Sequence, residues 1–187
     1  MTRDLDRRSF LVAASATAGG LTLGFAIPCT EPAGATGGAP EITCWIAIAP
    51  DDTVTIRVAR SEMGQGAMTG LAMLVTEELE CDWSKVRTEF VSPTLNLLKN
   101  RIWGDTSTGA SRSIASSQDY LRRAGATARE MLIAAAAAQW RVPPAQCVAA
   151  NGSISHRPSG RTVSFAAIAP AAAAISISRA VAPARRR

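Results

Sequence analysis

The sequence has few of the residue types that hold metal ions. It contains one histidine, His156, and four cysteines, none of which forms a Cys-x-x-Cys pair. Zinc and iron–sulfur sites in proteins need such ligands in clusters at close spacing. We therefore expect no metal site within this chain. We interpret the cysteines as buried thiols, and a disulfide in an oxidising compartment is the alternative, whose pairing the spacing does not give.

A basic stripe interleaved with aromatic residues is also lacking. The formal net charge is +5, but aromatic residues make up only 5% of the chain. Much of the positive excess lies at the C-terminal end, where Arg179, Arg185, Arg186 and Arg187 stand with no acidic residue. Nucleic-acid-binding domains carry basic patches on the folded part. We therefore expect no nucleic-acid partner.

Long, strongly apolar runs are absent as well. A membrane-spanning helix needs about 20 predominantly apolar residues, whereas the apolar run at residues 12–27 is short and interrupted by glycines. It follows Arg7-Arg8, and this start is similar to a twin-arginine export signal. We predict that residues 1–40 are a signal peptide and linker, that the twin-arginine translocase exports the chain to the periplasm, and that no permanent membrane span exists. An uncleaved membrane anchor or a disordered start is the alternative.

Apolar periodicity predicts an α+β domain over residues 41–174. The predicted strands cover residues 44–48, 53–58, 85–91, 148–150 and 153–155, and the predicted helices cover residues 67–80 and 116–140. Asn151-Gly152 indicates a two-residue hairpin turn. Residues 92–112 are expected to form a loop, and residues 163–174 begin like a strand or a helix. The expected fold is a mixed or antiparallel sheet with two main helices, preceded by the signal segment.

Gly64-Gln65-Gly66 lies between a predicted strand and a predicted helix. Such a turn directs backbone N–H groups outward at the positive end of the helix dipole, and glycine lets backbone approach a ligand closely. Gln65 offers a hydrogen-bond donor and an acceptor together. This pattern is typical of contact with an anionic or strongly hydrogen-bonding ligand. A tight connecting turn is the alternative.

Residues 104–113 form a second candidate loop, rich in small residues and hydroxyl groups. Its amides and hydroxyls are suited to surround a phosphate or the edge of a pterin, and an N-cap followed by a solvated loop is the alternative. Arg112 is expected to pair either with a phosphate or with a surface carboxylate. Elsewhere, we expect Glu62 to form a structural ion pair with Arg60, and His156 to lie at the surface.

Glu62-Met63-Gly64-Gln65-Gly66, followed by Thr69, resembles an element of the xanthine dehydrogenase and aldehyde oxidase family. In that family the equivalent turn contacts the molybdopterin cofactor. Residues 54–66 and 77–86, behind a twin-arginine leader, are similar to the isoquinoline 1-oxidoreductase β-subunit branch. The resemblance implies cofactor binding by Gly64, Gln65 and Gly66. It also places a second set beside the metal and pterin: Gly109, Ala110 and Ser111.

The resemblance further implies a molybdenum cofactor, a molybdopterin in its cytosine dinucleotide form. It implies a small-molecule aldehyde or N-heteroaromatic substrate oxidised with water as the oxygen source, and a [2Fe-2S] small subunit as partner. The family's catalytic glutamate lies in a Gly-Glu-Pro segment, which this sequence lacks. We therefore assign no catalytic or metal-ligating residue to this chain.

We expect an N-terminal fragment of the cofactor-binding subunit, inactive alone and with a truncated domain at residues 41–174. Residues 175–187 form an aberrant basic tail that resembles out-of-frame translation. A small exported, non-catalytic binding module with the cofactor-cradling fold is the alternative.

Overall fold

The computed structural model describes residues 39–175 and 181–183 of the 187-residue chain. These residues belong to one compact unit, which runs from Gly38 to Arg187. The predicted signal segment and most of the predicted aberrant tail lie outside the described residues. None of the helices in the described ranges is long and apolar enough to cross a membrane.

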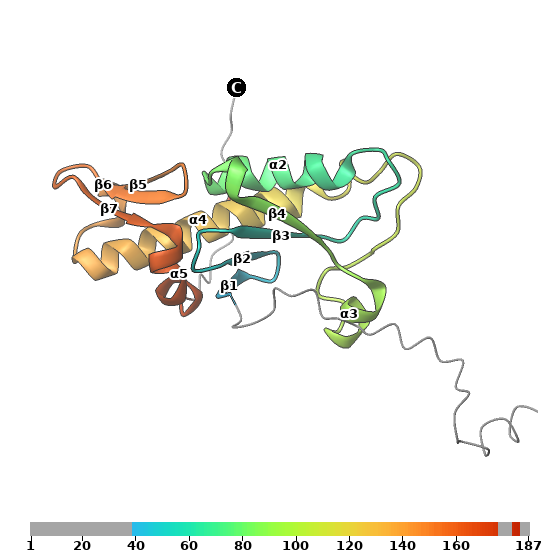
Figure 1. The fold of residues 1–187 in the computed structure, drawn as a ribbon, viewed down its shortest axis with the longest axis horizontal. Helices are drawn as coiled ribbons and strands as arrows, with labels where there is room; N and C mark the ends of the chain where they lie inside the picture. Colours follow the sequence, from blue (N-terminus) through green and yellow to red (C-terminus); the bar gives the residue numbers. More distant parts are fainter. Residues whose placement is uncertain (1–38, 176–180, 184–187) are drawn as a thin grey trace, which may run out of the picture. The chain divides into compact units, whose positions relative to one another are not determined.

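A four-stranded sheet forms the centre of the unit (Figure 1). Its strands are β1 (Glu41–Thr43), β2 (Ile46–Ile48), β3 (Val54–Val58) and β4 (Val86–Phe90), in that spatial order. The first three pair antiparallel, whereas β3 and β4 are parallel and are joined through helix α2 (Ala67–Leu79). Because parallel strands end at the same edge of a sheet, the segments that follow β3 and β4 lie together. Both candidate loops are in these segments.

Three antiparallel strands form a second sheet, consisting of β5 (Cys147–Ala150), β6 (Ser153–His156) and β7 (Arg161–Ser164). The predicted hairpin turn joins β5 to β6, with positive φ at both Asn151 and Gly152. Positive φ at both central residues is what this type of two-residue turn requires. Helix α5 (Phe165–Ala173) follows β7, and the Ser164 hydroxyl accepts the Ala167 N–H at its start.

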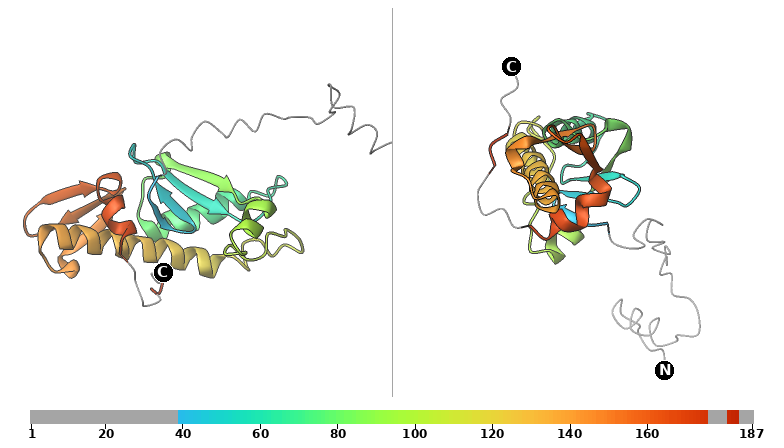
Figure 2. Two further views of the ribbon diagram at one scale, coloured as in Figure 1. Left: turned by 90° about the horizontal axis from the view of Figure 1, so that it is seen from below. Right: turned by 90° about the vertical axis from the view of Figure 1, so that its left-hand side faces the viewer.

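The long helix α4 (Gln118–Trp140) packs against both sheets and against α2 (Figure 2). Buried residues of α2, α4, α5 and both sheets belong to one continuous apolar core. In β3 this core receives the alternate residues Val54, Ile56 and Val58. The single core explains why the two sheets form one unit.

The α+β class, the mixed sheet and the two main helices are confirmed. Three features differ from the prediction: the strands form two sheets, a short helix α3 (Pro93–Leu98) interrupts the predicted loop, and β1 was not predicted. Helix α3 has a physical signal in Ser92, whose hydroxyl caps the Leu95 N–H, and in Pro93 at the first helical position. The undecided segment 163–174 contains the end of β7 and then α5.

Candidate functional site

The glycine turn lies between β3 and α2, as the sequence predicts. Gly64 has a φ of 92° and Gly66 a φ of 74°, in the left-handed region that favours glycine. Gly66 is also the N-cap of α2. A Cβ atom at either glycine would meet nothing within 4 Å, so the space above both is open. The turn therefore presents bare backbone at the positive end of a helix.

Glu62 occupies the inner side of this turn. Its carboxylate accepts the N–H groups of Gly64 at 2.8 Å, Gly66 at 2.9 Å and Met68 at 3.1 Å. Hydrogen bonds from the Met68 and Gly66 amides are the main causes that lower the pKa of Glu62 below its usual 4.5. The predicted ion pair between Glu62 and Arg60 is wrong, because the glycine conformations direct these backbone donors to Glu62 instead.

Gln65 is held by its own loop. Its Oε1 accepts the Met63 N–H at 2.6 Å, and its Nε2 donates to the Ser61 carbonyl at 2.9 Å. A carboxamide has two N–H donors and two oxygen lone pairs. The exposed Gln65 side chain is therefore fixed in orientation while one donor and one acceptor position remain for a ligand.

The second candidate loop lies directly beside the glycine turn. The Thr108 hydroxyl donates to the Ser61 carbonyl at 3.2 Å, which joins the two loops. Ala110 and Ser111 have φ values of 50° and 55°, and the space above Gly109 is open. The structure thus brings together both sets of predicted site residues: Gly64, Gln65 and Gly66 with Gly109, Ala110 and Ser111. All six are exposed.

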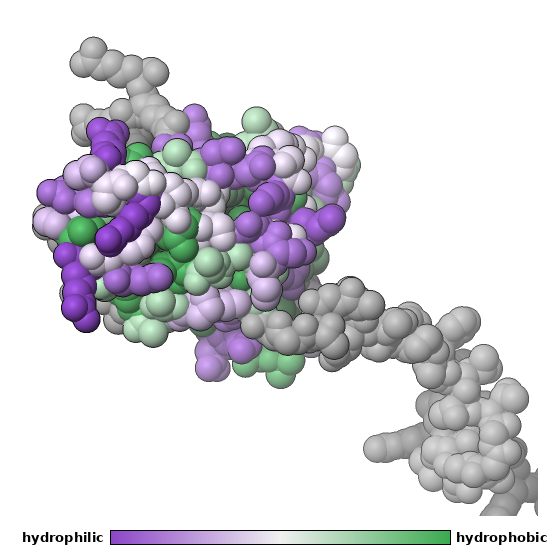
Figure 3. All heavy atoms as spheres, turned by 60° about the vertical axis from the view of Figure 1, so that its left-hand side comes forward, coloured by the Kyte–Doolittle hydropathy of each residue, from purple (hydrophilic) through white to green (hydrophobic). Residues whose placement is uncertain are grey.

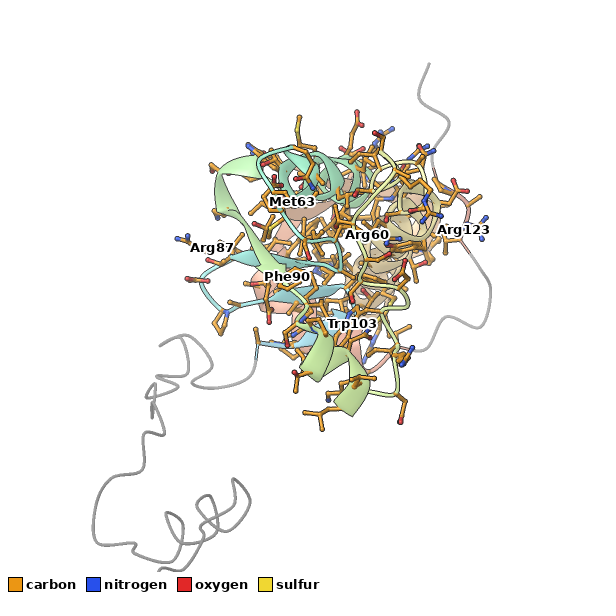
Figure 4. The ribbon with its side chains drawn as sticks, turned by 90° about the vertical axis from the view of Figure 1, so that its right-hand side faces the viewer. Arg60, Met63, Arg87, Phe90, Trp103 and Arg123 are labelled. Carbon is orange, nitrogen blue, oxygen red and sulfur yellow. The ribbon has the colours of Figure 1, made fainter. Side chains whose placement is uncertain are left out.

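Arg60 fastens the second loop to the end of β3 (Figure 4). Only 7% of this residue is exposed. Its guanidinium donates to the Ser117 and Ser116 hydroxyls, each at 3.0 Å, and to the Ser107 carbonyl at 2.5 Å. It also pairs with the Asp105 carboxylate at 3.1 Å. One buried cation therefore fixes the path of the chain on both sides of the predicted site residues.

Asp105 is the acidic partner in this network. The Ser107 hydroxyl and N–H both donate to its carboxylate, at 2.6 Å and 2.9 Å. These bonds, together with Arg60, lower the pKa of Asp105 from 3.8 to about 2. Neither Arg60 nor Asp105 was predicted as a site residue. The available signal was an arginine placed directly after a buried strand, where a charge needs partners.

A small polar cavity of about 60 Å³ lies within this network. It is lined by Arg60, Asp105, Ser107, Gly109, Arg112, Ser113 and Ser116. Its size suits ordered water better than a cofactor fragment. Arg112 forms no ion pair within the described ranges, so the predicted surface salt bridge is not found there.

His156 is buried, with 5% exposed, and the prediction that it lies at the surface is wrong. Its ring nitrogens lie 2.7 Å from the Ser159 hydroxyl and 3.0 Å from the Gln146 side-chain oxygen. The sequence did not show which face of the hairpin is covered, and His156 lies on the face that meets Trp140. Among the described residues, no group of three or more His, Cys, Asp or Glu side chains is placed to hold a metal ion.

Cys44, Cys81 and Cys147 are free thiols, and the last two are buried. Burial is the main cause that raises the pKa of Cys81 to about 11. Cys81 is therefore a protonated, unreactive thiol at neutral pH. Cys29 lies outside the described residues.

The two joined loops lie at the carboxyl edge of parallel strands in an α+β domain. The prediction that the glycine turn directs free N–H groups outward is wrong, because the Gly64, Gly66 and Met68 amides donate to Glu62. What the loops expose is open backbone at the glycines, the remaining amide groups of Gln65 and small polar side chains. Residues 6–183 match the molybdopterin cofactor-binding domain family. The chain belongs to this family, which confirms the resemblance stated from the sequence.

Two curated relatives are similar in sequence to most of this chain. It is 36% identical over 168 residues to isoquinoline 1-oxidoreductase subunit β of Brevundimonas diminuta, covering 86% of this chain and 21% of the relative. It is 34% identical over 168 residues to a membrane-bound aldehyde dehydrogenase (pyrroloquinoline-quinone) of Gluconacetobacter polyoxogenes, covering 86% and 20%. The chain therefore spans about a fifth of the length of these relatives.

Among solved structures, the fold is similar to quinoline 2-oxidoreductase from Pseudomonas putida 86, with a TM-score of 0.50 and 23% identity. The match covers 67% of this chain and 15% of that one. At this identity the likeness shows the fold alone.

Proposed function

We propose that this chain supplies one wall of the cofactor site in the molybdenum-binding subunit of a molybdenum hydroxylase. The observation that carries the proposal is the junction of the two loops through Arg60 and Thr108. Family membership and the likeness to an isoquinoline 1-oxidoreductase subunit support it. The chain's short span relative to that subunit supports a shared site, completed by other polypeptide.

The residues present fit a pterin cofactor. Open space lies above Gly64, Gly66 and Gly109, so backbone and ligand can come close. Gln65 keeps one donor and one acceptor position, which matches the paired donors and acceptors along a pterin edge. We propose that these residues, with Ala110 and Ser111, hold the cofactor in its cytosine dinucleotide form.

The bound molybdenum cofactor would supply oxidation of an aldehyde or N-heteroaromatic substrate, with water as the oxygen source. The role of this chain would be to bind and orient the cofactor. Glu62 is unsuited to act as a base, because hydrogen bonds from three backbone amides of the turn lower the pKa of its carboxyl group. We therefore propose that the catalytic glutamate and the [2Fe-2S] partner lie outside this chain, and that the chain is inactive alone.

We also propose export to the periplasm through the twin-arginine translocase, on the pattern of residues 7–11. This route transports folded proteins, which suits an enzyme that acquires its cofactor before export. Replacing Arg7 and Arg8 by lysine should retain the chain in the cytoplasm, measured by cell fractionation.

A non-catalytic binding module is the second candidate function. The continuous core of the described unit favours it, because residues of both sheets and of α2, α4 and α5 are buried together within this chain. This module would bind the cofactor without the remaining four-fifths of a subunit.

The test is a chimera in which this chain replaces the matched segment of the intact Brevundimonas relative. The purified chimera is assayed for molybdenum by mass spectrometry and for released cytidine nucleotide. We expect Gly66→Val to lower molybdenum occupancy about tenfold or more, because a branched side chain blocks the open backbone and strains a positive φ. Gly160→Val is the matched control, since Gly160 also has a positive φ but lies in the turn between β6 and β7.

Several results would contradict the proposal. Pyrroloquinoline quinone in place of molybdenum in the chimera would assign a different cofactor. Equal molybdenum occupancy in the Gly66→Val and Gly160→Val chimeras would remove the glycine turn from the site. Stoichiometric molybdenum in the isolated 187-residue chain would favour the binding module.

A further inference from the structure

Strand β4 is an open edge of the four-stranded sheet (Figure 1). Within the described ranges it pairs with β3 on one side, and no strand pairs with the other. Unprotected edges readily accept another strand, and soluble proteins usually cover or interrupt them. The opposite edge follows this rule, because β1 has three residues, an irregular register and contacts from α4 and α5.

The backbone of β4 directs alternate residues away from β3. The Val91 N–H donates to the Val58 carbonyl at 3.0 Å, and Val58 is in register with Phe90. In a parallel ladder this pattern turns the N–H and C=O groups of Arg87 and Glu89 toward β3. The corresponding groups of Thr88 and Phe90 then point outward, toward the place of a missing neighbour.

The side chains at this edge are incompletely covered. Thr88 and Phe90 are in register with Ile56 and Val58, so they lie on the same face of the sheet. Ile56 and Val58 are fully buried, whereas Phe90 is 37% exposed. The core-facing side of the sheet thus continues onto β4, where its side chains are partly exposed to solvent. Figure 4 views this end of the molecule, with Phe90 on β4 and the exposed Met63 on the segment between β3 and α2.

A groove adjoins the start of β4. Met73, Thr76 and Glu77 of α2 line it together with Trp83, and its volume is about 330 Å³. Trp83 belongs to the single turn of 3-10 helix (Trp83–Lys85) that leads directly into β4. The two large apolar side chains are open to solvent, with 55% of Met73 and 47% of Trp83 exposed. By contrast, polar and apolar residues are intermixed on the face shown in Figure 3.

We propose that β4 binds a β-strand from the remainder of the molybdenum-binding subunit, with an apolar side chain of that strand in the groove beside Trp83. Strand addition of this kind gains affinity from backbone hydrogen bonds and specificity from side-chain pockets. The inference rests on the proposed function, because it takes the partner to be the polypeptide that this chain lacks relative to its relatives.

Two observations favour this occupant over the chain's own ends. The described segment begins just before β1, and α5 near its C-terminal end contacts β1. The start of the described segment and helix α5 therefore lie on the β1 side of the sheet, away from β4. The longer relatives, in turn, contain about four times as much polypeptide again beyond the matched segment.

Hydrogen exchange tests the proposal directly. In the isolated full chain, the Thr88 and Phe90 amides should exchange freely while the Arg87 and Glu89 amides are protected by β3. In the chimera with the Brevundimonas subunit, exchange of the Thr88 and Phe90 amides should slow about 100-fold or more. Residue-resolved mass spectrometry measures both, and the Arg87 and Glu89 amides serve as internal controls.

Thr88→Pro adds a matched variant. Proline removes only the outward N–H at this position and leaves the ladder with β3 intact, so the Phe90 amide should lose protection in the chimera. Thr88→Val keeps the N–H and should keep that protection.

Three outcomes would overturn the inference. Free exchange of Phe90 in the chimera would show an open edge in the whole subunit. Protection of Phe90 in the isolated chain would assign the edge to residues 1–38 if the chain is monomeric in light scattering, and to a second copy if it is dimeric. Protection that Thr88→Pro leaves unchanged would also contradict strand addition. A chimera with a protected edge but no molybdenum would instead count against the proposed function.

Discussion

At Glu62, one exposed carboxylate organises three backbone amides at the start of α2. Side-chain acceptors at a helix N-terminus stabilise donors that the helix itself leaves unpaired. Glu62→Ala should therefore accelerate exchange of the Gly64, Gly66 and Met68 amides, on the order of tenfold. Glu62→Gln, which keeps an acceptor without the charge, should give a smaller increase. Equal exchange in all three proteins would contradict the role of Glu62.

The same carboxylate makes the turn pH-sensitive. Its pKa is lower in the folded chain than the usual 4.5, so its stabilising contribution is complete above pH 4.5. The contribution should disappear as the pH falls from 4.5 through the folded pKa. Amide chemical shifts of Gly64 and Gly66 should follow this titration in nuclear magnetic resonance spectra. In Glu62→Gln the same shifts should stay constant over that window.

The Arg60 guanidinium donates to four acceptors. A lysine ammonium group lacks the planar geometry needed to reach all four. Arg60→Lys should lower the free energy of unfolding by about 3 kcal/mol, because the mostly buried cation loses several hydrogen bonds, including the bond to the fully buried Ser117. The pKa of Asp105 should rise from about 2 only part of the way to 3.8, since the Ser107 hydrogen bonds remain. Denaturant unfolding and a carboxyl titration by nuclear magnetic resonance measure the two effects. An unchanged stability would show that Arg60 does not fasten the loop.

Individual residues also show which contacts could be predicted from the sequence and which could not. The glycines at 64 and 66 could be assigned to a turn because their position between a strand and a helix is a local property. The partners of Arg60 could not, because Asp105 lies 45 residues away in the chain. Pairing over that distance depends on β3 and β4 being neighbours, which periodicity alone does not give.

At the scale of elements, Gly125 lets α2 and α4 come into close contact. A Cβ atom there would lie 2.7 Å from the Val75 carbonyl oxygen and 3.0 Å from the Glu78 Cβ. Gly125→Ala should therefore destabilise the chain by about 2 kcal/mol, even though alanine favours helices. Gly70→Ala is the control, since its Cβ would meet only the movable Ile114 side chain, at 3.2 Å. Denaturant unfolding should show an unchanged or slightly higher free energy of unfolding for Gly70→Ala. A similar loss in the Gly125→Ala and Gly70→Ala variants would contradict this account.

Element length explains which parts of the fold were predictable. Helices α2 and α4 are long enough for the apolar period to show, and both were predicted. β1 and α3 have three and six residues, too few to display a period. The start of α3 nevertheless has a local signal in Ser92-Pro93, a capping hydroxyl followed by a proline at the first helical position.

At the scale of the whole unit, the sequence gives no means of deciding how many sheets the strands form. The strands of the second sheet have the same alternation as those of the first. They form a sheet of their own, and two helices connect it to the first sheet: α4 contacts β1 and β2 as well as β5 and β6, and α5 contacts β1 and β2 as well as β7. The joint core beneath both sheets is thus a consequence of these two helices, and it predicts how the unit unfolds.

Ile154 of β6 is fully buried in the core that both sheets share. Ile154→Ala should lower the free energy of unfolding by about 3 kcal/mol, through lost burial and the cavity left behind. Because the core is continuous, native-state hydrogen exchange should show the loss in β3 as fully as in β6. The exposed Thr162→Ala, on the neighbouring strand β7, is the control and should change neither. Loss of protection confined to β5, β6 and β7 would mean that the second sheet opens separately, and that the site-bearing sheet is stable without it.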